Sequence, residues 1–389
     1  MNTREISLEK LQIELKNNLS FWLKNALHQN KSDIYAEVSI NETPNNKALL
    51  GTMYLSRILF GASTGFSLIE NNSYIELADL SFRKLQECKN PRGGYYWAKT
   101  TSNTFEHDPE NVNMAQAFAL YGLVAYAKIK NSKKVDTIIE NHVSFIKETL
   151  YDEKNGGYID GFDKNWNLIE VQTKALGTHL HFLEAFVQLY KYKKDNNLVS
   201  VIEELISIIL EYFITKESYN CLHRLTPEWK PLPNEVWAGH NAECSWILCS
   251  AAEAIQHDNL LDKCNNLALT TMQQVISKAI DTKNGGVFNV LKNGKPTEKV
   301  KIWWPQAEAI IGLINCLNIS KDQKYLSQAN DLMDYVSTNF IASNGEWYTE
   351  IWNSGKPNVS LPIIHFWKSM YHTVRYYAEL NERVVNQKK

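Results

Sequence analysis

The stretch KNGGYIDGF, residues 154–162, places two adjacent glycines between a helix-like and a strand-like segment. The same turn returns 129 residues later as KNGGVFNV, residues 283–290. Glycine adopts backbone conformations with positive φ at little steric cost, so both stretches predict tight turns. A turn that recurs at such a distance suggests that the chain is built from repeated units.

Related turns give the length of the repeated unit. The last glycines of four such turns are Gly94, Gly157, Gly286 and Gly345. The steps between them are 63, 129 and 59 residues, so the period is roughly 60–65 residues with one turn missing. The missing turn is expected near residue 221 and a further one near residue 31, both in stretches without paired glycines. The sequence therefore predicts six units.

Each unit contains two helical patterns of different character. The first is amphipathic, with apolar residues at i, i+3, i+4 and i+7, as in residues 133–150. The second is apolar on nearly all sides, as in residues 114–127 and 306–317. A helix that is hydrophobic all round is a buried helix, so we expect an outer and an inner helix in every unit.

Six such pairs predict an all-α fold, an (α/α)6 barrel of helical hairpins with short β-hairpins in the loops at one end. The inner helices would surround a pocket. An open solenoid of stacked pairs is the rival fold, but the period is too long for the common helical repeats and no polar capping repeat is evident. We expect one catalytic domain that covers residues 1–389.

Composition excludes several classes of function. The net charge is −2, which does not indicate binding to nucleic acid. The six cysteines form no C-x-x-C pair, which favours free thiols over disulfides or zinc. The N-terminus has no apolar signal region and no window resembles a membrane span, so we expect a cytoplasmic protein. We also expect a monomer or homodimer.

Polar side chains on the inner helices are the candidate functional residues, because buried polar groups must be paired or line a cavity. Five lie at similar depth in their units: Arg57, His181, Glu243, Glu308 and His372. The same helices also carry Glu184, His240, Trp246, Trp303, Trp304 and Arg375. Any one of these residues alone is more often structural, but together they predict a pocket on the barrel axis.

Spacing selects which side chains share a face of a helix. Residues three apart lie on one face, as do His240 and Glu243, whereas residues two apart lie roughly 200° apart. Only one of His179 and His181 can therefore face the pocket. The pairing with Glu184 at i, i+3 favours His181.

Three kinds of chemistry fit such a pocket. A metal site is one alternative, but no H-E-x-x-H motif occurs, and arginine and tryptophan suit an organic substrate better; we expect no metal and no cofactor. A glycoside hydrolase would use two carboxylates, Glu243 and Glu308, and would leave the histidines without a role.

The third alternative is proton transfer by two bases. Inverting a carbon next to a carbonyl requires removal of a proton from one face and its return to the other. His240 and His372 are 132 residues apart, about two repeats, so they could flank a substrate on the axis. An arginine such as Arg57 would stabilise the anionic enediolate that forms.

Three segments carry a resemblance to a known family: GHNAECSWIL at residues 239–248, KIWWPQAEAIIGLIN at residues 301–315 and WKSMYHTVR at residues 367–375. They are similar to motifs of the N-acylglucosamine 2-epimerase superfamily, and most of all to its cellobiose 2-epimerase branch. The resemblance runs from Phe21 to the C-terminal motif. It implies a cofactor-independent epimerase on an (α/α)6 barrel, which acts through ring opening and a cis-enediolate.

The resemblance also implies a role for each matching residue. His240 and His372 would be the acid/base pair. Arg57 would hold the O1 and O2 oxygens, and His181 would assist ring opening or orient the substrate.

The remaining residues would support them. Glu243 would orient His240, and Glu308 would hydrogen-bond the substrate or His372. Trp304 and Trp367 would stack on the sugar. The other expected substrate contacts are Glu184, Trp246, Trp303 and Arg375.

Three positions depart from the pattern of the branch. The first repeat has no paired-glycine turn, Met114 stands where tyrosine is usual, and Gly177 stands where asparagine is usual. The expected substrate is the reducing-end residue of a β-1,4-linked disaccharide such as cellobiose or mannobiose. A free hexose, with 2-epimerisation or aldose–ketose isomerisation, is the alternative.

Overall fold

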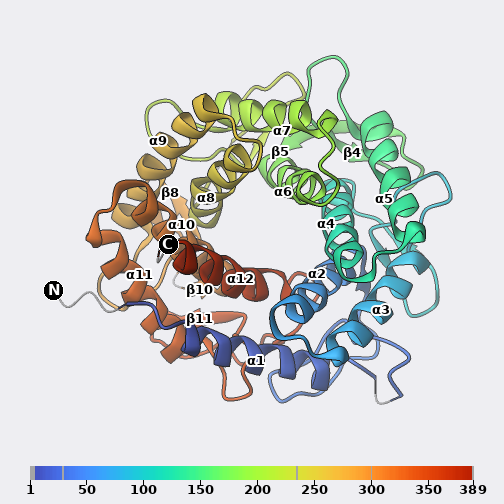
Figure 1. The fold of residues 1–389 in the computed structure, drawn as a ribbon, viewed down its shortest axis with the longest axis horizontal. Coiled ribbons are helices and arrows are strands. Elements are labelled where there is room, and N and C mark those ends of the chain that lie inside the picture. The colour runs from blue at the N-terminus through green and yellow to red at the C-terminus, as the bar shows by residue number, and fades with distance from the viewer. Residues whose placement is uncertain (1–4, 29, 234, 299, 388–389) are drawn as a thin grey trace.

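The computed structural model describes residues 5–28, 30–233, 235–298 and 300–387, and these contain two concentric rings of helices (Figure 1). The inner ring is α2 (Thr52–Ile69), α4 (Val112–Lys130), α6 (Leu176–Lys193), α8 (Ala238–Ala254), α10 (Trp303–Ser320) and α12 (Met370–Gln387). The outer ring is α1 (Leu8–Asn25), α3 (Asn72–Glu87), α5 (Lys133–Phe145), α7 (Asn197–Ile208), α9 (Asp258–Gln274) and α11 (Gln323–Tyr335). Outer and inner helices alternate along the chain, as the sequence predicted.

The barrel is closed. Helix α12 packs against α1, α2 and α10, so the last repeat meets the first. The (α/α)6 prediction is confirmed, and an open solenoid is excluded. None of the described helices is long and apolar enough to cross a lipid bilayer. The six cysteines are buried and free.

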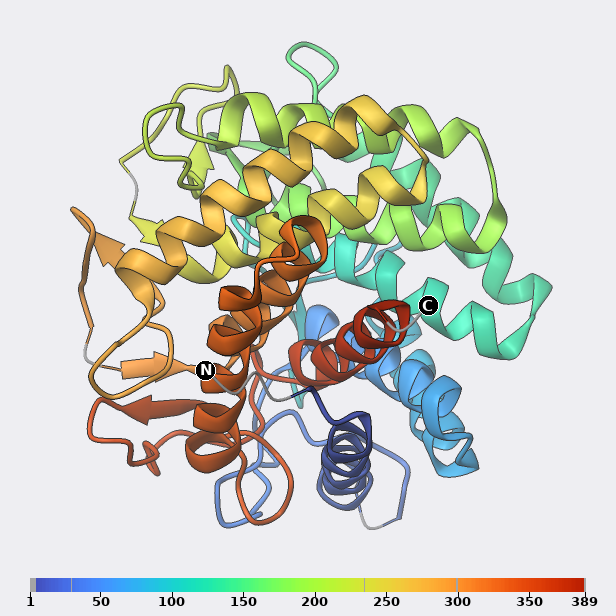
Figure 2. The same cartoon turned by 60° about the vertical axis from the view of Figure 1, so that its left-hand side comes forward.

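Short antiparallel strands gather at one end of the barrel, on the left in Figure 2. They are β1 (Leu50–Gly51), β2 (Ala98–Lys99), β3 (Phe105–Glu106), β4 (Asp160–Phe162), β5 (Leu168–Ala175), β6 (Arg224–Leu225), β7 (Val236–Trp237), β8 (Val290–Lys292), β9 (Lys295–Pro296), β10 (Val300–Ile302) and β11 (Glu350–Trp352). The expected hairpins occur as β2–β3, β4–β5 and β8–β9. The pairs β1–β2, β5–β6, β7–β8 and β10–β11 instead join neighbouring repeats, which the sequence did not predict.

The glycine turns are fastened to the inner helices by a recurring hydrogen bond. A side chain near the start of each of four inner helices accepts from the backbone N–H just after the turn. The pairs are Gln116 with Tyr95 at 2.8 Å, His179 with Tyr158 at 3.0 Å, Asn241 with Cys221 at 2.8 Å and Gln306 with Val287 at 2.7 Å. His179 is therefore one of these structural clamps, because it occupies the same place in its repeat as the two glutamines.

Glycine is required in these turns for two reasons. Gly157 has a φ of +71°, and a Cβ there would lie 2.7 Å from His179 Nε2. Gly286 has a φ of +79°, and a Cβ there would lie 2.5 Å from the Tyr335 ring. Side chains are excluded from both positions by conformation and by space. The repeated KNGG motif is a structural turn between an outer helix and the next inner helix.

Buried lysines provide a second anchor in three repeats. Each fully buried ammonium binds an acidic side chain in or next to the turn. The pairs are Lys174–Asp152, Lys301–Asp281 and Lys368–Glu346, with an Nζ–O distance of 2.8 Å in each. A buried ion pair is favourable only when its geometry is good, so these pairs hold the backbone in place where it leads into the inner helices.

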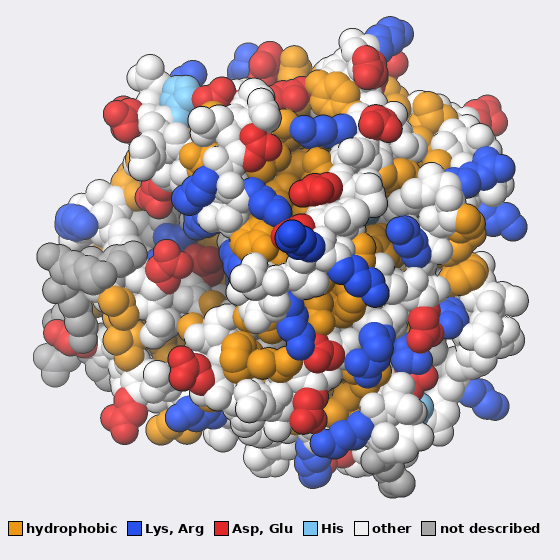
Figure 3. Space-filling model, turned by 45° about the vertical axis from the view of Figure 1, so that its right-hand side comes forward, with side chains coloured by type: hydrophobic (Ala, Val, Ile, Leu, Met, Phe, Trp, Pro, Cys, Tyr) orange, Lys and Arg blue, Asp and Glu red, His pale blue; other side chains and the backbone are white. Residues whose placement is uncertain are grey.

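The outer surface carries mixed charge. On the face drawn in Figure 3, Lys and Arg side chains alternate with Asp and Glu side chains, and neither sign covers the face. This mixture agrees with the net charge of −2.

The turn clamp can be tested by replacing Gln306 with alanine. The substitution removes the partners of both the N–H and the C=O of Val287, which Gln306 binds at 2.7 and 2.8 Å. Buried backbone groups left without partners are costly, so we expect the free energy of unfolding to fall by about 2–4 kcal/mol. Chemical denaturation measures this. Gln273→Ala, on the exposed face of α9, is the matched control and should change it by less than about 0.5 kcal/mol.

Candidate active site

A cavity of about 560 Å³ opens at the strand end of the barrel, and all six inner helices contribute side chains to it. Four of these helices begin directly after a strand: α2 after β1, α6 after β5, α8 after β7 and α10 after β10. The strands that join neighbouring repeats therefore hold the first turns of the inner helices around the cavity.

Eight of the predicted site residues line this cavity: Arg57, His181, His240, Glu243, Trp303, Trp304, Trp367 and His372. The other four do not line it. Glu184, Trp246, Glu308 and Arg375 lie beneath its floor, where they bind one another and the residues above them. They lie deeper along the inner helices than the histidines, and their assignment as substrate contacts stays a prediction.

Arg375 is the centre of the layer below the floor. Its Nη2 donates to Glu308 Oε1 at 2.6 Å and to Glu243 Oε1 at 3.1 Å. Its Nη1 donates to Glu184 Oε1, and it also contacts the hydroxyl of Tyr371. One guanidinium thus ties together carboxylates from α6, α8 and α10.

Glu308 holds His372 in one tautomer. His372 Nδ1 lies 2.8 Å from Glu308 Oε1, and a carboxylate accepts, so Nδ1 carries the proton. The free lone pair is then on Nε2 of His372. Trp246 Nε1 donates to the other oxygen of Glu308 at 3.1 Å and keeps the carboxylate in place.

Glu184 holds His181 in one tautomer in the same way. His181 Nδ1 lies 2.9 Å from Glu184 Oε2, which also accepts from the Tyr371 hydroxyl at 2.6 Å. Burial raises the pKa of Glu184, but the charge of Arg375 and the bond from His181 more than offset this and hold it at about 2. The carboxylate therefore stays ionised and fixes the imidazole.

His240 is held differently from the other two histidines. Its ring lies parallel to those of Trp237 and His223, with centroids 5.2 and 5.4 Å away. Glu243, expected to orient His240, binds Arg375 instead, and no hydrogen bond to the His240 ring occurs within the described residues. A neighbouring cation binds a carboxylate more strongly than a neutral imidazole does, so the orientation of His240 by Glu243 stays a prediction.

Trp304 lies between the two histidines. Its ring centroid is 5.5 Å from that of His240 and 5.5 Å from that of His372. Gly239 permits this position, because a Cβ there would lie 2.2 Å from the Trp304 ring. Both imidazoles therefore lie next to the same indole ring in the cavity wall.

Burial sets the charge of the site. It lowers the pKa of His240 and of His372 well below the ordinary histidine value; neighbouring histidines add to this at His240, and Arg375 and Arg57 add to it at His372. Both rings are therefore neutral near pH 7. Burial, together with the nearby Glu308, raises the pKa of Glu243 well above its usual range.

Arg57 supplies a positive charge to the cavity. Burial lowers its pKa to about 10, so it remains protonated at neutral pH. Its Nη1 donates to the carbonyl oxygen of Trp367 at 2.8 Å, and its guanidinium lies 4.1 Å from the centroid of the Phe118 ring. These contacts hold the cation against the wall.

Sequence reasoning missed several lining residues, among them His223, Trp237 and His365. All three lie before inner helices rather than on them, and Trp237 is the last residue of β7. His223 falls in the fourth repeat, where the paired glycines are absent and the register of the loop could not be assigned. His223 is two residues from the apolar Cys221 and from Leu225, a spacing that places all three on one face of a strand, and this was the available signal.

The donor set does not fit a metal ion. Among the described residues, Glu243, Glu308 and His372 could bring ligand atoms within 4.8 Å of one another. The guanidinium of Arg375 already binds both carboxylates, so a cation placed there would be repelled by it.

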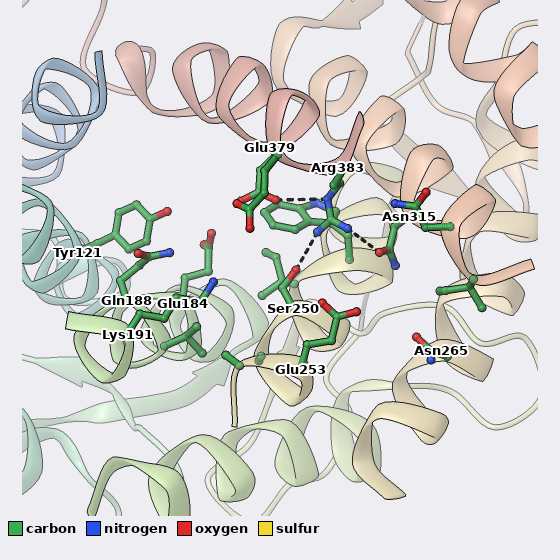
Figure 4. A pocket seen from close by; sticks show the side chains of 18 residues that line it. Tyr121, Glu184, Gln188, Lys191, Ser250, Glu253, Asn265, Asn315, Glu379 and Arg383 are labelled. Atoms are coloured by element: carbon green, nitrogen blue, oxygen red, sulfur yellow. Dashed lines mark hydrogen bonds and ion pairs between the residues drawn. The ribbon is translucent and has the colours of Figure 1, made fainter. Parts of the chain in front are cut away.

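A second cavity, of about 570 Å³, lies at the opposite end of the inner helices (Figure 4). Glu184 and Trp246 line it from above. Arg383 binds Asn315 Oδ1 at 2.6 Å, Ser250 Oγ at 2.7 Å and Glu379 Oε2 at 3.3 Å in its wall. The layer around Arg375 therefore separates two cavities on one axis.

Comparison with known proteins agrees with this architecture. The chain is 25% identical over 380 residues to a cellobiose 2-epimerase of Dictyoglomus turgidum, and the alignment covers 94% of this chain and 95% of that protein. The solved cellobiose 2-epimerase of Bacillus thermoamylovorans matches with a TM-score of 0.88 and 24% identity over 97% of this chain and 99% of that one. A solved D-mannose isomerase matches with a TM-score of 0.87 and 16% identity over 97% and 98% of the two chains.

The family model named N-acylglucosamine 2-epimerase (GlcNAc 2-epimerase) matches residues 38–375. That span begins before the first inner helix and ends at Arg375, so it includes every residue of the cavity described above. The chain belongs to the N-acylglucosamine 2-epimerase family, and like other epimerases it is an isomerase.

Proposed function

We propose that the protein interconverts the gluco and manno configurations at C2 of the reducing-end residue of a β-1,4-linked disaccharide, without a cofactor. The observation that carries this proposal is the pair of neutral imidazoles, His240 and His372, next to Trp304 in one cavity. We also propose that residues 1–389 form a single catalytic domain. Its state as a monomer or homodimer stays a prediction.

The reaction follows from the roles of the lining residues. The sugar ring opens with His181 assisting, and one of the two histidines takes the C2 proton. The electron pair becomes a cis-enediolate, whose negative charge lies next to Arg57. Rotation about C2–C3 then presents the other face. Once the anion has formed, the second histidine takes up a proton from solvent and delivers it to C2, and the first histidine releases its proton to solvent. Protons and electrons balance, so no oxidant or metal is needed.

The position of Trp367 favours a disaccharide. Trp367 is 42% exposed at the mouth of the cavity and packs on Trp97 with ring centroids 5.6 Å apart. An exposed aromatic face beside a pocket is suited to stacking on a sugar ring. We propose that Trp304 contacts the reacting residue and Trp367 the second one. The cellobiose 2-epimerase that is 25% identical supports the same choice of substrate.

A free hexose is the second candidate substrate. Apart from Trp367, the proposed contacts all surround the reacting residue, so the same site could epimerise mannose or glucose. Delivery of the proton to C1 of the enediolate would instead give aldose–ketose isomerisation. A glycoside hydrolase is less well supported, because Glu308 lies beneath the floor and both candidate carboxylates bind Arg375.

The two-histidine assignment is tested by His240→Ala and His372→Ala. Each substitution removes one of the two proton carriers, so we expect epimerisation of cellobiose to fall by at least about 10³-fold. Proton NMR in D₂O, which follows deuterium incorporation at C2, measures it. His28→Ala, outside the cavity, is the control. Wild-type rates in both cavity variants would falsify the assignment.

The pH dependence follows from the lowered histidine pKa values. A base whose pKa is lowered stays deprotonated as the pH falls and loses activity only below that pKa. We therefore expect kcat/KM at pH 6.0 to remain within about twofold of its value at pH 7.5. A base with the ordinary histidine pKa of about 6.5 would instead lose about three quarters of its activity, and that result would contradict the structure.

The choice between disaccharide and hexose is tested by Trp367→Ala. If Trp367 contacts the second sugar, kcat/KM should fall about tenfold for cellobiose and little for mannose, since stacking contributes about 1 kcal/mol or more. Trp352→Ala is the matched control, because Trp352 is 45% exposed and lies outside the cavity. An equal loss for both sugars would mean that Trp367 serves the reacting residue.

A further inference from the structure

The second cavity, which we call the rear cavity, has no role in the proposed reaction. Its volume of about 570 Å³ lies within the range of about 300–1,000 Å³ that is typical of small-molecule pockets. Protein interiors are closely packed, so packing alone does not account for a space of this size between helices. The small side chains of Ser250, Ala251 and Ala254 on α8 leave it open. Lys191 and Glu253 in its lining are exposed, so a small molecule can enter from solvent.

Tyr121 points its hydroxyl group into the rear cavity (Figure 4). Only 6% of the residue is exposed, and its ring packs against Phe60 and Tyr371, with ring centroids 4.6 and 5.7 Å away. The hydroxyl makes no hydrogen bond to any residue in the part of the chain that the structure describes. A buried polar group without a partner is costly, so this hydroxyl must bind water or a ligand in the cavity.

Other side chains in the lining also have unused hydrogen-bonding groups. Gln188 Oε1 accepts from Lys128 Nζ at 2.6 Å, and among the described residues its NH2 group has no acceptor. Glu379 binds Arg383 through Oε2, which leaves Oε1 for a further donor. The wall of the rear cavity therefore offers both donors and acceptors.

The charges of the lining favour a neutral ligand. When the ion pairs of Arg375 and Arg383 are set aside, the charged side chains that remain are Lys191, Glu253 and Glu382. An anion would be repelled by the two carboxylates, and an organic cation by the ammonium group. Within the described ranges, no group of three possible metal ligands occurs in this cavity.

We propose that the rear cavity is a second ligand-binding site, which takes a small neutral molecule with several hydroxyl groups, a monosaccharide or a hexitol. A hydroxyl group both donates and accepts, so it matches a wall that mixes donors and acceptors. Tyr121, Gln188 and Glu379 would bind hydroxyl groups of the ligand. The inference does not rest on the proposed function, because the layer around Arg375 separates this cavity from His240 and His372.

A thiol placed in the rear cavity tests the site. Ala254→Cys lies in the lining, and the six native cysteines are buried, so iodoacetamide should label the added thiol first. Glucose and glucitol are the probes; glucitol has no carbonyl group and cannot be epimerised. A bound probe should slow labelling about threefold when the free probe is at twice its Kd. Mass spectrometry of the protein measures the rate. Ser354→Cys, exposed and outside the cavity, is the control and should be labelled equally fast with and without the probe.

Tyr121→Phe, combined with Ala254→Cys, tests the hydroxyl contact. It removes one hydrogen bond to the ligand, so the Kd obtained from protection should rise about 2–10-fold. The Tm should not fall, because the described chain loses no hydrogen bond. Tyr126→Phe on the same helix is the matched control. The Tyr126 hydroxyl donates to Asp79 at 2.7 Å outside the cavity, so this variant should keep the Kd.

Three results would overturn the inference. If neither probe protects the Ala254→Cys thiol, the cavity holds only water. If phosphate or spermidine protects it and the two probes do not, the ligand is charged. If Tyr121→Phe leaves the Kd unchanged, the proposed contacts are wrong. Protection is measured without turnover, so this inference and the proposed function can fail separately.

Discussion

One buried guanidinium organises the interior of this barrel. Arg375 binds carboxylates from three other inner helices, and all four groups are buried. A buried carboxylate without a partner costs several kcal/mol, so α6, α8 and α10 must present Glu184, Glu243 and Glu308 to the same point. Two of these carboxylates in turn orient His181 and His372. The layer beneath the cavity therefore determines the geometry of the layer that lines it.

The charge of this layer also suits an anionic intermediate. Three ionised carboxylates around one guanidinium would leave a net negative floor, which would oppose formation of an enediolate. The raised pKa of Glu243 reduces this charge, because a protonated Glu243 leaves the floor with one negative charge fewer. Arg57 adds a positive charge in the wall, and the first turns of the inner helices point their N–H groups toward the cavity. The burial of Glu243 and the convergence of helix N-termini on the cavity thus both favour an anionic intermediate.

The sequence predicted the ring of helices well and the depth of the site poorly. The period of the repeat could be predicted because turns with positive φ select glycine. The inner helices could be predicted because a buried helix must be apolar. Spacing of i, i+3 identifies a shared face, but the second residue lies about 4.5 Å deeper along the axis. His372 therefore lines the cavity while Arg375 lies beneath it. The partners of Glu243 depend on contacts between distant repeats, which no local pattern records.

Glycine illustrates why such distinctions require coordinates. Gly157 is needed for its positive φ, and Gly239 for the close approach of Trp304, while Gly177 is needed for neither. The paired glycines mark Gly157 as a turn residue in the sequence, but no local pattern distinguishes Gly239 from Gly177. What separates them is the set of atoms that a Cβ would meet: a clamp histidine, an aromatic ring, or open cavity.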